Sequence, residues 1–450
     1  MPPAVAGTRP PVHDLVGVGF GPSNLALAIA VAEHNAAASR PLDARFLERQ
    51  PRFGWHRGML LDDATMQVSF LKDLVTMRNP TSMFSFLAYL HCRGRLVDFI
   101  NHKTMFPLRA EFHDYFEWAA EQVDDQVSYR HQVTSVRPVT DGTGISYLDV
   151  QTMCSDQPAS AAEPFATCRT RNLVLAPGLR PWLPDGVVVS PRIWHTEDLL
   201  DNVPRLGAHG VTRLIVVGAG QSAAEATAYL HERFPRAEIC GVFARYGYTP
   251  ADDSPFANRI FDPAAIDDYF VSPEPLKQRL MGYHRNTNYS VVDLDLIQEL
   301  YRRAYQEKVR GTERLRMFNL AQITETVPSS EGVRTVIESL ATGNKTVLDA
   351  DAVVYATGYR PVDPAEVLGE LDQYVVRDSR GRPVVSRDYR LVTDPAVRCG
   401  IYLQGGTEHS HGLTSSLLSA TAVRVGEILQ SVLLTSDASI SSQAARYDSV

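Results

Sequence analysis

The sequence predicts an α/β protein with two Rossmann-like dinucleotide-binding domains, because it contains two glycine-rich turns about two hundred residues apart. The first is VGVGFGPSN, residues 16–24, and the second is VVGAGQSAAE, residues 216–225. Each turn follows a short apolar run and precedes a stretch with apolar residues at helical spacing. A strand, a glycine turn and a helix in this order place free helix N–H groups where a dinucleotide pyrophosphate binds.

The first turn favours an adenine dinucleotide whose ribose carries no 2'-phosphate, such as FAD. Its glycines permit a tight turn and let phosphates approach the backbone, while Pro22 suits the first turn of a helix. The predicted strand LDARFLERQ then reaches Glu48, whose carboxylate can accept hydrogen bonds from ribose hydroxyls. A surface glycine loop is the alternative interpretation. The residues predicted to contact FAD here are Gly17, Gly19, Gly21, Pro22, Ser23, Asn24 and Glu48.

The second turn has the same order of elements, but its second strand ends in a base. A helix is predicted over residues 222–234, and the strand EICGVFAR after it ends in Arg245. Arginine can pair with a 2'-phosphate and therefore favours NADPH, although a solvated charge at a strand end is the alternative. The Ser222 hydroxyl can meet a phosphate or cap the helix. The residues predicted to contact NADPH are Gly218, Gly220, Gln221, Ser222 and Arg245.

Two later segments indicate how the domains connect. RNLVLAPGLRPWLP (171–184) and DADAVVYATGYRP (349–361) each combine an apolar run with A-x-G and a following proline. Chain crossings of this sort join the flavin and nicotinamide domains of flavoproteins that bind two dinucleotides, so Thr357 and Gly358 are predicted to lie near NADPH. Two unrelated strand–turn units are the alternative.

These features predict a domain order in which the FAD domain is built from both ends of the chain. A mostly helical substrate region is expected at the junction of the two domains. The predicted boundaries are 12–205 for the first part of the FAD domain, 206–349 for the NADPH domain with the substrate region at about 250–310, 350–430 for the second part of the FAD domain, and 1–11 and 431–450 for flexible tails.

The composition is that of an ordinary soluble protein. The chain has 450 residues, 44% of them hydrophobic and 21% charged, and this length predicts two or three domains. The formal net charge of -8 argues against a nucleic-acid partner or an anionic membrane surface.

The five scattered cysteines form no CxxC pair, which argues against a redox dithiol and a zinc cluster and favours a reducing compartment. The N-terminal segment MPPAVAGTRPPVHD lacks the apolar core of a signal peptide, and no stretch approaches the length of an apolar membrane helix. We therefore expect a cytoplasmic protein without a bound metal. The segment 154–167 is predicted to be a surface loop.

Five further stretches together resemble a known family. They are MQVSFLKDLVTMRNPTSMFSFLAYLHCRGRLVDF (66–99), FPLRAEFHDYFEW (106–118), DDSPFANRIF (252–261), HRNTNYSVVD (284–293) and GGTEHSHGLTSSLLSATAVR (405–424). Together they resemble the flavin-dependent N-hydroxylating monooxygenases, which oxidise the side-chain amine of ornithine or lysine and usually serve hydroxamate siderophore synthesis. The resemblance extends from about residue 13 to residue 424. Three blocks within these stretches, KDLVTMRNP (72–80), DDSPFAN (252–258) and NYSV (288–291), are far more specific than either glycine turn.

The resemblance implies an enzyme that uses FAD, NADPH and dioxygen. In this family NADPH reduces FAD, dioxygen forms a C4a-hydroperoxyflavin, and the neutral substrate amine attacks its distal oxygen. The oxidised nicotinamide nucleotide stays bound and shields that intermediate from water. The predicted reaction is hydroxylation of the small amino acid L-ornithine to N5-hydroxyornithine.

Several alternatives remain open from the sequence. L-lysine N6-hydroxylation is the nearest, because one methylene provides only about 1–3 kcal/mol of discrimination. The KDLVT and NYSVVD blocks resemble the ornithine enzymes more closely. A broader flavin monooxygenase of amines, sulfides or ketones is a second alternative, and an NADPH oxidase or sensor that has lost hydroxylation is a third.

The product can feed a siderophore or a hydrazine-containing peptide, and relatives are frequently homotetramers.

The resemblance also implies roles for individual residues. The predicted catalytic residues are Gln67, beside the flavin, Lys72, which pairs with the substrate carboxylate, and Asn288. The predicted substrate contacts are Lys72, Asn258, Asn288 and Ser419. Additional FAD contacts are Trp55, His56, Gln67 and Leu417, and Arg109 is expected to face the nicotinamide nucleotide.

The residue types alone permit other roles. Lys72 can be a solvated helix charge, although the apolar run SFLKDLVT is an unusual place for one, and asparagines are common in turns. Arg109 can serve packing or a salt bridge. His411 is either a base or a structural residue of its loop. Ser415 stands where the family often has an acid, so this block gives no finer inference about the substrate.

Overall fold

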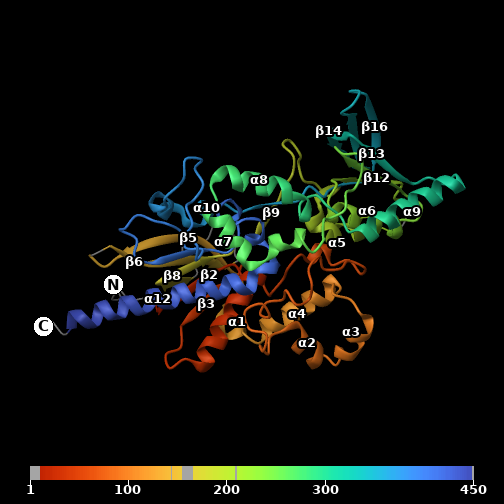
Figure 1. The fold of residues 1–450 in the computed structure, drawn as a ribbon. Coiled ribbons are helices and arrows are strands. Elements are labelled where there is room, and N and C mark those ends of the chain that lie inside the picture. The colour runs from red at the N-terminus through yellow and green to blue at the C-terminus, as the bar shows by residue number, and fades with distance from the viewer. Residues whose placement is uncertain (1–10, 143, 155–165, 208–209, 448–450) are drawn as a thin grey trace, which may run out of the picture.

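The computed structural model describes residues 11–142, 144–154, 166–207 and 210–447. Two five-stranded parallel sheets organise the molecule, and each has a glycine turn and a helix after one of its strands (Figure 1). This arrangement confirms the predicted α/β class with two Rossmann-like domains. Most of the predicted surface loop, residues 155–165, lies outside the described residues.

The first sheet carries the first glycine turn, which joins β2 to α1 (Pro22–Ala37). Along each strand, alternate residues face α1 and the C-terminal helix α12 (Thr421–Tyr447) or a second sheet on the other side. The three central and edge strands at residues 15–18, 172–175 and 400–403 are therefore buried throughout. The strand order is β19 (Gly400–Leu403), β8 (Asn172–Leu175), β2 (Leu15–Val18), β3 (Ala44–Leu47) and β4 (Val127–Ser128).

The second sheet carries the second turn, which joins β11 to α6 (Gln221–Arg233). Its order is β10 (Ile193–His195), β17 (Ala352–Tyr355), β11 (Arg213–Val217), β12 (Glu238–Phe243) and β13 (Leu315–Asn319). The strands β10 and β17 lie outside the range 206–349 predicted for this domain, so that boundary was wrong. Both are short buried strands, and only their hydrogen-bonded partners decide to which sheet they belong.

Among the described residues, the other strands form one sheet with a single parallel pair at its edge, one antiparallel sheet and one small ribbon. The first sheet has the order β1 (Val12–His13), β7 (Ala166–Thr170), β6 (Ile145–Cys154) and β5 (His131–Thr140), and the second β14 (Ala321–Pro328), β15 (Val333–Ser339) and β16 (Lys345–Ala350). The ribbon pairs β9 (Leu179–Pro181) with β18 (Tyr359–Pro361). These two segments are the predicted chain crossings, and they lie side by side where the chain passes between the domains.

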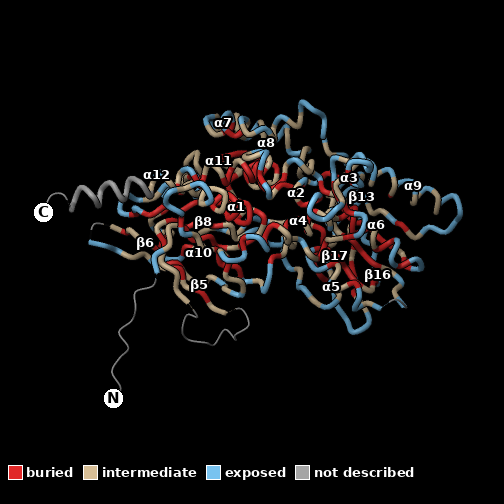
Figure 2. The backbone as a smooth tube through the Cα atoms, turned by 90° about the horizontal axis from the view of Figure 1, so that it is seen from below, coloured by how far each residue is buried: buried red, intermediate tan, exposed pale blue. Residues whose placement is uncertain are grey.

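Helices cover the sheets and fill the junction between them. The region 250–310 is mostly helical, as predicted, and in Figure 2 its α9 lies at the exposed end of the molecule with few buried residues. The remaining α-helices are α2 (Phe86–Cys92), α3 (Leu96–His102), α4 (Arg109–Glu121), α5 (Leu199–Asn202), α7 (Pro263–Val271), α8 (Glu274–His284), α9 (Leu294–Arg310), α10 (Pro364–Leu368), α11 (Glu408–His411) and α12 (Thr421–Tyr447).

Short 3-10 helices connect many of these elements. They are η1 (Arg57–Met59), η2 (Asp124–Gln126), η3 (Thr196–Asp198), η4 (Val203–Leu206), η5 (Ala257–Phe261), η6 (Arg285–Thr287), η7 (Gly369–Tyr374), η8 (Leu413–Ser416) and η9 (Leu418–Ala420). Four of them, η5, η6, η8 and η9, contain or adjoin the residue blocks that carry the family resemblance.

Helix α12 corrects the prediction of a flexible C-terminal tail from residue 431. The helix extends from Thr421 to Tyr447, and Val425, Ile428 and Val432 are fully buried in the core of the first domain. The packing of this apolar stripe against α1 stabilises the helix, and neither glycine nor proline interrupts it after residue 426. The Ser-rich composition of the segment therefore gave a misleading signal.

Candidate active site

The first glycine turn is built for a close backbone approach. Gly19 has φ +81°, and a Cβ there would stand 2.4 Å from the carbonyl oxygen of Ala176. By contrast, a Cβ at Gly21 would meet no protein atom within 4 Å. Gly21 is the N-cap of α1 and offers no capping side chain. The front of this helix is therefore open, and its first N–H groups are free for an anion.

Glu48 lies at the predicted position directly after β3, but its carboxylate also supports the turn. One oxygen accepts from the Phe20 backbone N–H at 2.6 Å and the other from the Gln50 N–H at 2.8 Å. Asn24 likewise faces the turn, donating to the Gly19 carbonyl at 2.7 Å. Gln404, which was not predicted, donates to the Asn24 side chain at 2.8 Å. These polar contacts hold the glycine turn in one conformation.

Arg424 is a buried cation beside the same helix and was not predicted. It is 1% exposed and comes from α12, and its guanidinium donates to Ser23 Oγ and Thr421 Oγ1, each at 3.1 Å. It also donates to the Ser415 carbonyl. All its hydrogen-bond acceptors among the described residues are uncharged, and burial lowers its pKa. An arginine within the apolar run SATAVRVGEIL was the available sequence signal.

The second glycine turn repeats the geometry of the first. Gly218 has φ +141°, and a Cβ there would stand 2.3 Å from the Ala356 carbonyl oxygen. Gly220 is the N-cap of α6 and again leaves the helix without a capping side chain. Arg245 is exposed beyond β12 and donates to the Ser290 carbonyl at 3.0 Å. Its guanidinium therefore lies at the surface near this turn, which suits a contact to a phosphate of a bound nucleotide.

Thr357 and Gly358 lie in the crossing between the domains. The Thr357 hydroxyl donates to the Trp182 carbonyl, and the Trp182 N–H donates to the Gly358 carbonyl at 2.9 Å. In this structure both residues thus join the two crossings. Their predicted contact with NADPH stays a prediction.

Arg109 forms the salt bridge that the sequence left as its alternative role. Its guanidinium donates to both carboxylate oxygens of Glu225 on α6, at 2.7 and 2.9 Å, and also to the Met59 carbonyl at 3.0 Å. The side chains of Arg109 and Glu225 are 12% and 6% exposed. This buried bidentate pair fastens the first domain to the nucleotide-binding helix of the second.

Lys72 is half-buried and lies against the loop that contains the DDSPFAN block. Its Nζ stands 5.3 Å from the centre of the Phe261 ring, a cation–π contact. Burial lowers the pKa of Lys72 below its ordinary value of 10.5, and the charge of Asp262 partly opposes that shift. The lysine is therefore not the freely solvated helix charge that the sequence left as an alternative.

The two predicted asparagines lie in loops on either side of α7 and α8. Asn258 donates from its side-chain amide to the Asp253 carbonyl at 2.6 Å. Asn288 is half-buried next to Tyr289, whose hydroxyl donates to Glu408 in the C-terminal block. The structure thus connects the NYSV and GGTEHSHG blocks, although their positions are about 120 residues apart.

Ser419 has a buried hydroxyl without a hydrogen-bond partner among the described residues. An unsatisfied buried hydroxyl costs free energy unless a ligand or a water completes it. Leu417, two residues earlier, is half-buried. Both residues border the 3-10 helices that lead into α12.

Trp55 and His56 lie between the first domain and the crossing. The Trp55 ring meets Phe116 edge-on with 5.3 Å between centroids, and the His56 ring lies 5.7 Å from Tyr359. His56 has φ 47°, a left-handed conformation that is uncommon outside glycine. Gln67 is exposed, and its amide donates to Asp293 at 2.7 Å.

His411 is a structural residue in this structure. Its Nδ1 is hydrogen-bonded to the Ser410 hydroxyl at 2.8 Å and its Nε2 to the Arg387 carbonyl at 3.2 Å, and its ring stacks on that of Tyr389. Burial lowers its pKa to about 4, so it is neutral at physiological pH. The Ser415 hydroxyl donates to the Gly412 carbonyl at 2.8 Å and stabilises the same loop.

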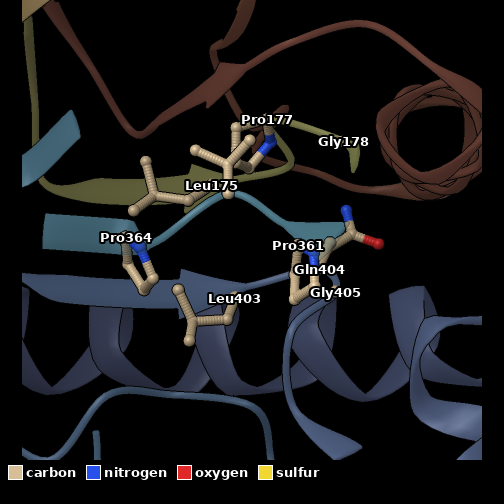
Figure 3. A pocket seen from close by; sticks show the side chains of 9 residues that line it. Leu175, Pro177, Gly178, Pro361, Pro364, Leu403, Gln404 and Gly405 are labelled. Atoms are coloured by element: carbon tan, nitrogen blue, oxygen red, sulfur yellow. The ribbon is translucent and has the colours of Figure 1, made fainter. Parts of the chain in front are cut away.

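Figure 3 shows a small cavity where β8 and β19 end beneath the crossing. Its volume of about 20 Å³ is enough for a water molecule but not for a nucleotide. The lining residues are Leu175, Pro177, Gly178, Pro361, Val362, Pro364, Leu403, Gln404 and Gly405. Gln404, which also supports the first turn, is the member of this lining that connects the cavity to the nucleotide pocket.

Other kinds of site are not found in the described part of the chain. No group of three or more His, Cys, Asp or Glu side chains there is placed to hold a metal ion, and the five cysteines are free thiols. None of the described helices has the length and apolar character needed to cross a membrane.

The fold and the two helix N-termini without capping side chains define a protein with two dinucleotide-binding units. Residues 11–361 match the model of the L-lysine 6-monooxygenase/L-ornithine 5-monooxygenase family. The chain belongs to this family.

Two curated relatives are similar over nearly their whole length. An L-ornithine N(5)-monooxygenase of Burkholderia cepacia is 41% identical over 411 residues, which cover 90% of each chain. An L-ornithine N(5)-monooxygenase of Pseudomonas aeruginosa is 37% identical over 422 residues, which cover 93% of each chain.

Solved structures give the same picture. The ornithine N-hydroxylase of Kutzneria sp. 744, in a structure with reduced FAD, NADP+ and L-ornithine, is 48% identical with a TM-score of 0.88. The match covers 94% of this chain and 99% of that one. An L-lysine 6-monooxygenase of Pseudomonas syringae is 31% identical with a TM-score of 0.81, covering 94% of this chain and 99% of that one.

Proposed function

We propose that this protein is an FAD- and NADPH-dependent monooxygenase that hydroxylates the side-chain amine of L-ornithine to N5-hydroxyornithine. The observation that carries the proposal is the 48% identity, over 94% of the chain, to an ornithine N-hydroxylase whose structure holds FAD, NADP+ and L-ornithine together. The two uncapped helix N-termini and the half-buried Lys72 are the features of this chain that support the proposal.

The first turn fits FAD. A Cβ at Gly21 would meet no protein atom within 4 Å, and the uncapped N–H groups at the start of α1 can bind an anion there. Glu48 and Asn24 keep the turn in shape, and Arg424 adds a buried positive charge beside Ser23. When bound, the flavin supplies the hydride acceptance and oxygen activation that no side chain can provide.

The second turn fits NADPH. Gly218 and Gly220 bring the backbone close to the phosphates, and the start of α6 offers its N–H groups. Arg245, exposed beside this turn, is the residue that we assign to the 2'-phosphate. A guanidinium pairs with a phosphate through two parallel hydrogen bonds, which favours NADPH over NADH.

The substrate residues hold the amino-acid head and leave the side-chain amine free to react. Lys72 pairs with the carboxylate, and the amides of Asn258 and Asn288 bind the head from two loops. The unsatisfied Ser419 hydroxyl is available as a further hydrogen-bond partner. Fixing the head at a distance places the amine in a near-attack position, where it must be neutral to act as a nucleophile.

Ornithine is favoured over lysine by the pattern of similarity. The ornithine enzymes are 41%, 37% and 48% identical to this chain, whereas the lysine enzyme is 31% identical. The pocket discriminates between the two substrates by one methylene, so some lysine turnover is expected.

The test is an assay of the purified protein with FAD and NADPH for hydroxylamine formation from L-ornithine, L-lysine and shorter diamines. We expect hydroxylamine in the greatest yield from L-ornithine. Turnover of a ketone or sulfide without any hydroxylamine would instead identify a broader flavin monooxygenase. Peroxide release equal to NADPH consumption, unchanged by any amino acid, would identify an oxidase.

A variant connects the assay to the site. Lys72→Ala should raise the KM for L-ornithine by about tenfold or more and leave flavin reduction by NADPH unchanged, because the lysine contacts the substrate and not the nucleotide. An unaltered KM would remove Lys72 from the substrate site.

We also propose that the protein is a cytoplasmic homo-oligomer, with a tetramer as the expected state. Large apolar side chains are exposed near α2 and α3, including Met83 at 76%, Val97 at 68% and Ile100 at 61%. Exposed apolar clusters commonly mark subunit interfaces. Light scattering after size-exclusion chromatography would report a single monomer mass if this proposal is wrong.

A further inference from the structure

Asp293 precedes helix α9 but does not cap it. An aspartate at a helix N-cap normally accepts a hydrogen bond from a backbone N–H in the first turn. The Asp293 side chain makes no such bond. Its Oδ2 atom instead accepts from Gln67 Nε2 at 2.7 Å and from Gln221 Nε2 at 3.2 Å. Helix capping therefore does not account for this carboxylate.

The two glutamines come from opposite sides of the proposed active site. Gln67 belongs to the segment placed beside the flavin, and Gln221 is the first residue of the nucleotide-binding helix α6. Gln221 is held at both ends of its amide, because its Oε1 accepts from the Asp293 N–H at 2.9 Å. Its Nε2 also donates to Glu225 at 3.0 Å, and Arg109 fixes Glu225 in turn.

The surroundings of Asp293 disfavour the charged form of its carboxyl group. The residue is half-buried, and burial together with the nearby charge of Glu225 raises the pKa of its carboxyl group. An asparagine would cap a helix equally well without this cost. A carboxylate, however, binds the two amide donors on its Oδ2 more strongly than the neutral oxygen of an asparagine would, because hydrogen bonds to a charged acceptor are about twice as strong.

We propose that Asp293 is a positioning residue that orients the Gln67 amide beside the flavin and ties it to Gln221 at the nicotinamide side. The inference rests on the proposed function, which places Gln67 at the flavin. In this proposal Asp293 acts by orienting the Gln67 amide, and Gln221 anchors the carboxylate.

Loss of this positioning should change the proportion of NADPH oxidation that produces hydroxylamine rather than hydrogen peroxide. In the coupled reaction, NADPH, a proton, dioxygen and the amine give NADP+, water and the hydroxylamine. In the uncoupled reaction, NADPH, a proton and dioxygen give NADP+ and hydrogen peroxide. A displaced Gln67 shifts the balance to peroxide, because the site no longer holds its polar groups in the reactive arrangement.

The first test compares Asp293→Asn with Asp295→Asn. Both variants remove one negative charge from the first turn of α9, but Asp295 is exposed and Asp293 alone contacts the glutamines. We expect Asp293→Asn to raise the share of peroxide by about fivefold, with NADPH oxidation near the wild-type rate. Asp295→Asn should match the wild type. Equal peroxide shares in the two variants would overturn the proposal.

The second test asks whether Asp293 acts through Gln67. The peroxide share of Gln67→Ala/Asp293→Asn should equal that of Gln67→Ala alone, because the carboxylate then has no Gln67 amide to orient. A further multiplicative rise in the double variant would show that Asp293 acts by another route and would contradict the proposal.

The third test uses the bound flavin as a reporter and does not need turnover. The visible circular dichroism of the bound flavin should change in the same way in Asp293→Asn and Gln67→Ala, and stay unchanged in Asp295→Asn. If Asp293→Asn folds poorly, Asp293→Ser, which retains a capping side chain, takes its place. A wild-type flavin spectrum in the Asp293 variant would overturn the proposal.

These readouts separate the two hypotheses. If the wild-type protein makes no hydroxylamine from any amine, the proposed function fails, and the flavin spectra still decide whether Asp293 positions Gln67. If the wild type hydroxylates L-ornithine and the Asp293 variant stays fully coupled, only the positioning role fails.

Discussion

The two glycine turns are alike in sequence, but the buried arginine beside each helix has a different partner. Next to α1, Arg424 is 1% exposed and its described hydrogen-bond acceptors are all uncharged. Next to α6, Arg109 forms a bidentate ion pair with Glu225. The helix dipole disfavours a cation near a helix N-terminus. An anion bound beside Arg424 and the start of α1 would therefore be stabilising.

The difference teaches how the two pockets obtain positive charge. In the first pocket none of the described hydrogen-bond acceptors of the buried Arg424 is a carboxylate, and we propose that the pyrophosphate of bound FAD offsets this charge. In the second pocket the charge of Arg109 is already neutralised, and the pair fastens two domains together. In our proposal, recognition of the NADPH phosphate there falls to Arg245, which is exposed.

The largest expected effects come from the turns themselves. Gly19→Ala places a Cβ 2.4 Å from the Ala176 carbonyl oxygen at φ +81°, and Gly218→Ala places one 2.3 Å from the Ala356 oxygen at φ +141°. Each change costs at least about 3 kcal/mol at its turn. We expect Gly19→Ala to lose FAD binding by about 100-fold or more, and Gly218→Ala to retain FAD but slow its reduction by NADPH similarly.

The measurements are flavin content by absorbance and stopped-flow reduction by NADPH. Gly21→Ala serves as the control for folding, because a Cβ at this position meets no protein atom within 4 Å. In the absence of FAD, this variant should have the same melting temperature as the wild type. Loss of both nucleotides in either of the two turn variants would show that the pockets are not independent.

Breaking the paired arginine has the next largest effect. Arg109→Met leaves the Glu225 carboxylate buried without its partner, which costs about 3–5 kcal/mol. The free energy of unfolding from urea titration of the FAD-bound protein checks this expectation. The double variant Arg109→Met/Glu225→Gln removes both charges and should recover part of the loss. A change below about 1 kcal/mol in the single variant would show that the pair contributes little.

Replacing Arg424, which has no carboxylate partner, should weaken FAD binding and leave the stability of the apoprotein unchanged, whereas replacing Arg109 should lower the stability. Arg424→Met takes away a buried charge with no carboxylate partner, so the apoprotein should keep its melting temperature while FAD affinity falls by about tenfold. Fluorescence titration with FAD measures the second quantity. Arg424→Lys retains a charge and should lose less affinity. Equal FAD affinity in the methionine variant would remove Arg424 from the flavin pocket.

The smallest effect is expected at the exposed arginine. Arg245→Ala should narrow the preference for NADPH over NADH by about fivefold, mainly through a higher KM for NADPH, because an exposed charge pair is worth little more than 1 kcal/mol. The ratio of kcat/KM values for the two nucleotides is the measurement. A preference that does not change would contradict the contact with the 2'-phosphate.

Much of the local structure follows from the sequence. The runs at residues 15–18 and 214–217 form the strands before the turns, and α1 and α6 begin where the glycines end. These elements are predictable because a strand, a tight turn and a helix start depend on neighbouring residues. The resemblance to the family followed from five stretches that lie far apart in the chain.

The long-range arrangement was not predictable in the same way. The assignment of β10 and β17 to the second sheet depends on pairing across more than 150 residues, and the helical C-terminus depends on the packing of α12 against α1. The hydrogen-bond partners of the predicted polar residues could not be predicted from the sequence either. Gln67 and its acceptor Asp293, for example, are 226 positions apart.

The sequence by itself therefore determined where the two nucleotide turns are and which family the chain resembles, because both are encoded in short stretches of residue types at fixed spacing. Only the tertiary structure decided that Arg109 is paired and Arg424 is not. Residues 23 and 424 meet only because α12 packs on the first domain. Whether a buried charge finds a carboxylate depends on such contacts, which no local pattern records.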